Sequence, residues 1–96
     1  MEYRCLSETG LRVSRIALGT WAMGGWMWGG ADKRESIETI QAALHKGVNL
    51  IDTAPVYGFG KAEELVGEAL KEAGAHKKTL LSTKACLDWT GDETIV

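Results

Sequence analysis

Three side chains at or shortly after the ends of predicted strands could together carry proton-transfer chemistry. Asp52 ends one short apolar segment, Lys84 ends another 32 residues later, and Tyr57 lies five residues after Asp52. A phenol is a poor acid at neutral pH, but a neighbouring ammonium group favours the phenolate and makes the hydroxyl a usable proton donor. A carboxylate paired with the ammonium would hold it in place, so the trio is suited to protonating a carbonyl oxygen. The alternative is an exposed Asp–Lys pair, of little energetic value, beside an ordinary loop tyrosine.

The elements that would position these side chains repeat along the chain. Three short apolar segments predict strands, each closed by a glycine or a charged residue: 16–18 with Gly19, 48–51 with Asp52, and 79–83 with Lys84. These closing residues are 33 and 32 residues apart. Amphipathic patterns between them predict two helices, one from the N-cap Asp32 to Gly47 and one over about 62–73. Strands that alternate with helices indicate a parallel sheet, and function in such folds lies at the carboxyl ends of the strands.

The first residues and the last ones complete the predicted architecture. Segments 3–6 and 11–14 around a polar turn predict an N-terminal β-hairpin, and no third helix follows Lys84. Three βα units cannot close a barrel, since a full (βα)₈ barrel takes ~250 residues. The chain is therefore either a small open α/β domain or part of a longer fold, and the second is favoured.

Composition narrows the class of protein. The chain has 96 residues, of which 45% are hydrophobic and 25% charged, values that are typical of one globular unit. A pI near 5.6 gives no reason to expect nucleic acid or an anionic membrane as partner. Met1–Arg4 lacks the apolar stretch of a secretory signal, so a cytoplasmic location is expected. Cys5 and Cys86 have no metal-ligand spacing and are expected to be packed free thiols.

Glycine-rich nucleotide loops are not supported by the spacing. The glycines after Leu18 do not form a GxGxxG motif that opens a helix, and segment 58–62 lacks the P-loop spacing. Trp26 and Trp28 are candidates for lining a substrate pocket, because apolar aromatic walls are typical of such sites. Packing against neighbouring loops is the alternative for both indoles.

Several motifs in order resemble the aldo-keto reductase family. Segment 51–58, Ile-Asp-Thr-Ala-Pro-Val-Tyr-Gly, closely resembles a motif of that family, and the expected Glu-Glu-Leu-Val-Gly follows at 63–67. Segments 9–14, 18–21 and 82–84 are similar to its hairpin, first strand and third strand. The glycine- and tryptophan-rich loop looks more like the bacterial and plant open-chain branch than the mammalian one. The resemblance covers the chain from Tyr3 to about Cys86.

The resemblance implies a fold and an activity. The fold would be α/β, an N-terminal hairpin plus the first three βα units, without the last helix, of an incomplete (βα)₈ TIM barrel. Residues 1–96 would be the N-terminal portion of one barrel domain, with the hairpin at 1–14 and part of the barrel at 15–96. The activity would be NADPH-dependent reduction of a small aldehyde or ketone by a NADP-dependent oxidoreductase.

The resemblance also implies roles for individual residues. Tyr57 would be the general acid, Lys84 its partner, and Asp52 the partner of Lys84. Thr20, Trp21 and Asp52 would lie against the nicotinamide end of the cofactor.

Other parts of the family's site fall outside this chain. Its catalytic histidine would follow the third strand, whereas His45 and His76 lie at the other end of the predicted sheet. The segments that bind the adenosine phosphate would also follow later. Residues 1–96 alone are therefore expected to be inactive and to self-associate through open sheet edges. The alternative function is that of a non-catalytic truncated fragment or a binding module.

Overall fold

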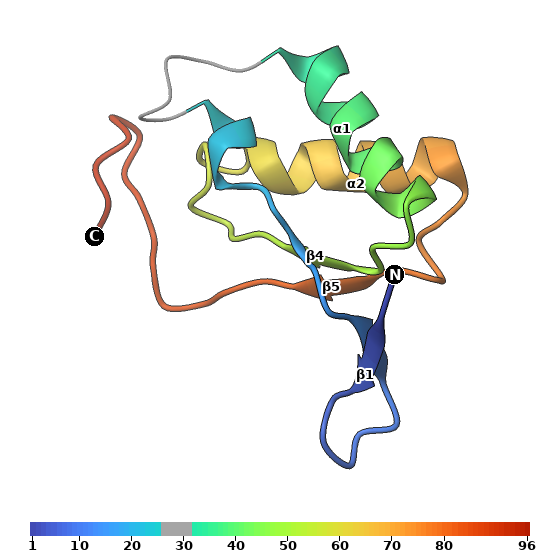
Figure 1. The fold of residues 1–96 in the computed structure, drawn as a ribbon. Helices are drawn as coiled ribbons and strands as arrows, with labels where there is room; N and C mark the ends of the chain where they lie inside the picture. Colours follow the sequence, from blue (N-terminus) through green and yellow to red (C-terminus); the bar gives the residue numbers. More distant parts are fainter. Residues whose placement is uncertain (26–31) are drawn as a thin grey trace.

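The chain folds into two small sheets and two long helices (Figure 1). The computed structural model describes residues 1–25 and 32–96. In chain order the elements are β1 (Tyr3–Cys5), β2 (Arg12–Ser14), β3 (Leu18–Gly19), the 3₁₀ turn η1 (Trp21–Gly24), α1 (Lys33–His45), β4 (Leu50–Asp52), α2 (Lys61–Ala73) and β5 (Leu80–Ser82). The predicted order of hairpin, strands and helices is confirmed.

The strands that follow the hairpin form one parallel sheet in the order β3-β4-β5. Gly19 is paired with Asp52, and Asp52 with Ser82, so the three carboxyl ends are level. The strands are shorter than the sequence predicts. Val48 does not join β4, because its N–H is bonded to the Ala43 carbonyl at the end of α1 (3.1 Å). The apolar segments thus include residues that connect helix to strand.

The core lies between the sheet and the two helices, which cover the same face of it (Figure 1). Ile51 of β4 is fully buried at its centre. The other fully or nearly fully buried members come from the apolar stripes of the two helices: Ile37, Ile40, Leu65, Val66, Ala69 and Leu70. Burial of this apolar area is the main favourable contribution to folding.

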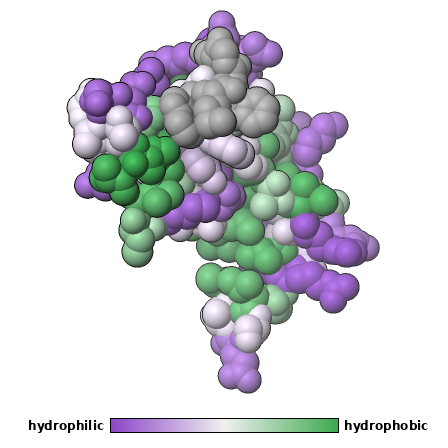
Figure 2. All heavy atoms as spheres, turned by 90° about the vertical axis from the view of Figure 1, so that its left-hand side faces the viewer, coloured by the Kyte–Doolittle hydropathy of each residue, from purple (hydrophilic) through white to green (hydrophobic). Residues whose placement is uncertain are grey.

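The covering of the sheet stops short of its β5 edge. Leu81 is paired in register with Ile51 and so shares its face, yet it is 53% exposed. Ile16 and Leu87 are also more than half exposed. Figure 2 shows apolar surface interrupting the polar surface on one face of the molecule. These side chains leave apolar area open to solvent at the margins of the sheet.

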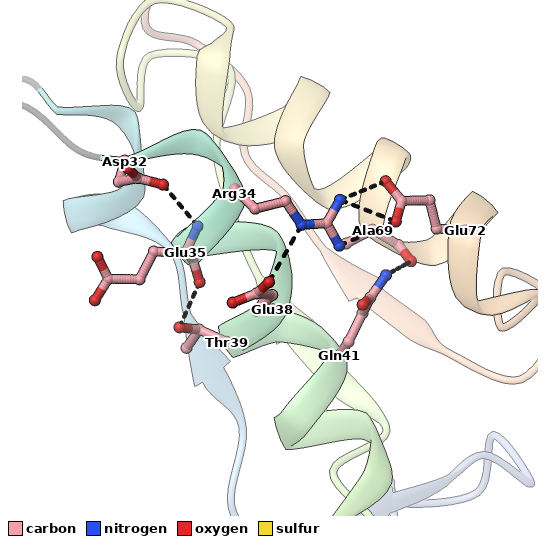
Figure 3. Close-up of polar contacts among 8 residues, drawn as sticks. All are labelled: Asp32, Arg34, Glu35, Glu38, Thr39, Gln41, Ala69 and Glu72. Atoms are coloured by element: carbon pink, nitrogen blue, oxygen red, sulfur yellow. Dashed lines mark hydrogen bonds and ion pairs between the residues drawn. The ribbon is translucent and has the colours of Figure 1, made fainter.

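Polar contacts fix α1 and its position on α2 (Figure 3). The Asp32 carboxylate accepts a hydrogen bond from the Glu35 N–H (2.8 Å), which confirms the predicted N-cap. The Arg34 guanidinium donates to both carboxylate oxygens of Glu72 at 3.2 Å, and this interaction lowers the pKa of the Glu72 carboxyl. Gln41 donates to the Ala69 carbonyl (3.3 Å). The Arg34–Glu72 pair is exposed, so it contributes little to stability.

The hairpin is attached near the amino end of β4, away from Asp52. The Ser14 N–H donates to the Asn49 side-chain oxygen (2.7 Å), and the Asn49 amide donates to the Arg12 carbonyl (2.8 Å). The Tyr3 hydroxyl donates to the Gly47 carbonyl (2.8 Å). The hairpin therefore leaves the carboxyl ends of the strands uncovered.

The expectation of packed thiols is wrong. Cys5 and Cys86 are both exposed. Cys5 is the last residue of β1 in the hairpin, and Cys86 lies in the non-helical segment after β5. Hydrophobic composition alone could not separate these positions from the core.

Across the ranges 1–25 and 32–96, no helix is long and apolar enough to cross a membrane.

Candidate active site

The level ends of β3, β4 and β5 bring together the side chains singled out by the sequence. Asp52 is the last residue of β4, and Lys84 follows the last residue of β5 by two positions. The Thr53 N–H donates to the Ser82 carbonyl (2.8 Å), which extends the pairing beyond the strands. The Asp52 and Lys84 side chains therefore project from neighbouring strand ends at the same edge.

The ammonium group of Lys84 is held by three oxygen atoms. Its Nζ donates to Asp52 Oδ1 (3.0 Å), to Asp52 Oδ2 (3.1 Å) and to the Thr53 carbonyl (3.0 Å). The two side chains are 44% and 41% exposed, so the pair contributes little to stability. Its geometry is nevertheless closely defined, because both carboxylate oxygens and a backbone carbonyl fix one nitrogen.

Tyr57 lies beside that ammonium. The Lys84 Nζ is 4.9 Å from the centroid of the Tyr57 ring. Backbone hydrogen bonds hold Tyr57 on both sides, since its N–H donates to Ala54 and its carbonyl accepts from Ala62 (both 3.2 Å). The predicted convergence of Asp52, Tyr57 and Lys84 is thus confirmed by the distances.

Electrostatics keep Lys84 charged. A hydrogen bond with the Tyr57 side chain is the main interaction that raises the pKa of Lys84 above its ordinary value. The Asp52 carboxylate raises this pKa further, and burial of the ammonium opposes both effects. The ammonium is therefore fully protonated at neutral pH. A cation therefore lies beside the Tyr57 ring at the carboxyl edge of the sheet.

Two residues after β3 complete the edge. Trp21 stacks on Tyr57, with 6.2 Å between ring centroids and 26° between ring planes. The residue remains 44% exposed. Thr20 is fully buried, and its hydroxyl donates to the Asp52 carbonyl (3.0 Å). Trp21 thus presents an aromatic surface at the rim, and Thr20 ties the end of β3 to the end of β4.

Trp26, Trp28, His45 and His76 are the other residues that the sequence analysis singled out. Trp26 and Trp28, predicted to line a substrate pocket, lie outside the described residues. His45 and His76 are exposed, one at the end of α1 and one before β5, at the opposite end of the sheet from Lys84. Within the described part of the chain, no group of three His, Cys, Asp or Glu residues could hold a metal ion.

Sequence reasoning missed the contribution of the backbone. The Thr53 carbonyl binds Lys84, and the backbones of Gly24 and Gly58 touch beside Tyr57. Neither feature leaves a periodic or compositional signal, although Gly58 is the last residue of the motif at 51–58.

Comparisons with known proteins point to one family. The profile of the Aldo/keto reductase family matches residues 15–95. The aldo-keto reductase YhdN of Bacillus subtilis is 57% identical over 97% of this chain, and the NADH-specific methylglyoxal reductase of Escherichia coli is 44% identical over 88%. The structure of a glycerol dehydrogenase from Gluconobacter oxydans superposes with a TM-score of 0.78 at 49% identity, over 98% of this chain.

The matches also define which part of the fold is present. The chain spans 28%, 26% and 29% of the lengths of those three proteins. The hairpin and the three parallel strands are the N-terminal part of the (βα)₈ barrel of such reductases, without a closed sheet in the described residues. Because the family profile matches most of the length of this chain, the chain belongs to the aldo/keto reductase family.

Proposed function

We propose that residues 1–96 are the N-terminal portion of a single barrel domain in an enzyme that reduces an aldehyde or ketone to an alcohol with NADPH. Residues 1–14 would supply its hairpin and 15–96 the first part of its barrel. The observation that carries the proposal is the ammonium of Lys84, bound to both oxygens of Asp52 and lying 4.9 Å from the Tyr57 ring. Family membership supports the same reaction class.

The three side chains have distinct tasks in this reaction. Tyr57 donates its phenolic proton to the carbonyl oxygen as negative charge develops there. The Lys84 ammonium stabilises the phenolate that is left, and Asp52 keeps the ammonium in place. When bound, the nicotinamide cofactor supplies the hydride.

The residues at the rim fit the nicotinamide end of such a cofactor. Trp21 offers a partly exposed aromatic face, and the Asp52 carboxylate is 41% exposed beside it. Both lie at the open carboxyl edge, where barrel enzymes bind their ligands. Thr20, which the resemblance also places against the cofactor, is fully buried, so we assign it the role of tying the end of β3 to the end of β4 through its bond to the Asp52 carbonyl.

Turnover by a complete barrel tests the proposed function. We call "parent reductase" the protein in which residues 1–96 are followed by the rest of the barrel, taken from the Bacillus subtilis relative. With methylglyoxal and a set of other aldehydes and ketones it should oxidise NADPH at roughly 1–10³ s⁻¹. Since the Escherichia coli relative is named NADH-specific, NADH is assayed in parallel. Faster turnover with NADH would correct the cofactor alone, and no turnover with either would contradict the function.

A further inference from the structure

Two loops of the candidate site touch through their backbones. A Cβ atom added to Gly24 would lie 2.5 Å from the nitrogen of Gly58, 2.6 Å from its Cα and 2.7 Å from the carbonyl carbon of Tyr57. A Cβ on Gly58 would lie 2.4 Å from both the Cα and the oxygen of Gly24. Cβ atoms do not approach other atoms within 3.0 Å, so this contact requires glycine on both sides.

The contact joins the two elements that carry the aromatic pair. Gly24 is the last residue of η1, which begins at Trp21, and Gly58 follows Tyr57 directly. In Figure 1 the η1 turn lies beside the loop that leads into α2. The position of η1 therefore limits where the Tyr57 backbone can lie.

We propose that Gly24 is a positioning residue for Tyr57. Because Gly24 has no side chain, η1 packs directly against the Tyr57–Gly58 peptide, and this contact holds the phenol between Trp21 and Lys84. This inference rests on the proposed function, because it assumes that the place of the Tyr57 hydroxyl matters. Any side chain on Gly24 must separate η1 and the Tyr57–Gly58 peptide by at least about 0.5 Å to reach an allowed distance. Displacements on the order of 1 Å at reacting groups can cost about 10²-fold in rate.

Gly24 is the better of the two glycines to substitute. Gly58 has a φ of +61°, so alanine there would strain the backbone as well as collide with Gly24. Gly24 has no such φ, and the three nearest atoms that a Cβ there would meet in the described residues all belong to the facing Tyr57–Gly58 backbone. Gly67, in the middle of α2 with open space around its Cα, is the matched control.

In the parent reductase, Gly24→Ala should lower kcat about 10- to 100-fold while the Kd for NADPH stays within about twofold. Gly67→Ala should leave both values within about twofold. A cooperative thermal unfolding transition should show that the Gly24→Ala variant is folded. An unchanged kcat, a loss confined to cofactor binding, or failure of this variant to fold would each overturn the inference, since Gly24 would then serve something other than Tyr57.

A double-mutant cycle separates positioning from general damage. If Gly24 acts through the Tyr57 hydroxyl, Gly24→Ala should cost less than about threefold in a Tyr57→Phe background. If the losses of kcat caused by Gly24→Ala and Tyr57→Phe instead multiply in the double variant, the inference is contradicted. If Tyr57→Phe alone keeps full activity, the proposed function fails instead, so the two failures are distinguishable.

Discussion

Replacing Tyr57 with phenylalanine should slow carbonyl reduction by the parent reductase about 10²- to 10⁴-fold and leave NADPH binding almost unchanged. The substitution removes only the phenolic oxygen. The ring that stacks on Trp21 at 6.2 Å and faces the Lys84 ammonium at 4.9 Å stays in place. The measurement is kcat from NADPH oxidation, with the Kd of NADPH from fluorescence titration.

Tyr3→Phe is the matched control for that experiment. Its hydroxyl donates to the Gly47 carbonyl at the hairpin, away from the carboxyl edge. Loss of this bond should lower the free energy of unfolding by about 1 kcal/mol and leave kcat within about twofold. A Tyr57→Phe enzyme that works within twofold of the wild-type rate would rule out Tyr57 as the proton donor.

Residues 1–96 produced alone should show no NADPH-dependent reduction and should self-associate. The resemblance places the catalytic histidine and the phosphate-binding segments later in the family's barrel, so Trp21 and Asp52 would meet only one end of the cofactor. Such partial contact cannot offset the cost of immobilising the ligand. In the described part of the chain, β3 and β5 each pair on one side only, and Leu81 and Leu87 are more than half exposed.

Size-exclusion chromatography and an NADPH oxidation assay on the same preparation test this second expectation. Oligomers or aggregates with background oxidation are expected. Addition of the rest of the barrel should restore both a single species and activity. A monodisperse monomer of residues 1–96 that oxidises NADPH at ordinary enzyme rates would contradict it.

The site could be predicted from sequence because its spacing reflects a repeated unit. The near-constant interval between Gly19, Asp52 and Lys84 corresponds to one strand and one helix, so their approach at one edge of the sheet could be predicted. The end of β5 could not, because the strand stops at Ser82, two residues before Lys84. The N-cap at Asp32 and the left-handed glycine at Gly47 were likewise marked by local chemistry.

Other features depend on contacts that a single sequence does not display. The start of β4 at Leu50 depends on the bond from Val48 back to α1. The exposure of Cys86 depends on what covers the segment after β5. The approach of Gly24 to Gly58 joins residues 34 positions apart, for which neither periodicity nor composition offers a signal.

A double-mutant cycle on Tyr57 and Lys84 tests most directly whether Asp52, Tyr57 and Lys84 deliver the proton as one unit. Lys84→Met removes the ammonium and leaves a partly exposed carboxylate that water can solvate. Measured as kcat of the parent reductase, each single variant should lose about 10²-fold or more, and the double variant should be within about threefold of the slower single variant. Losses that multiply in the double variant would show that Tyr57 and Lys84 act independently and would contradict the mechanism.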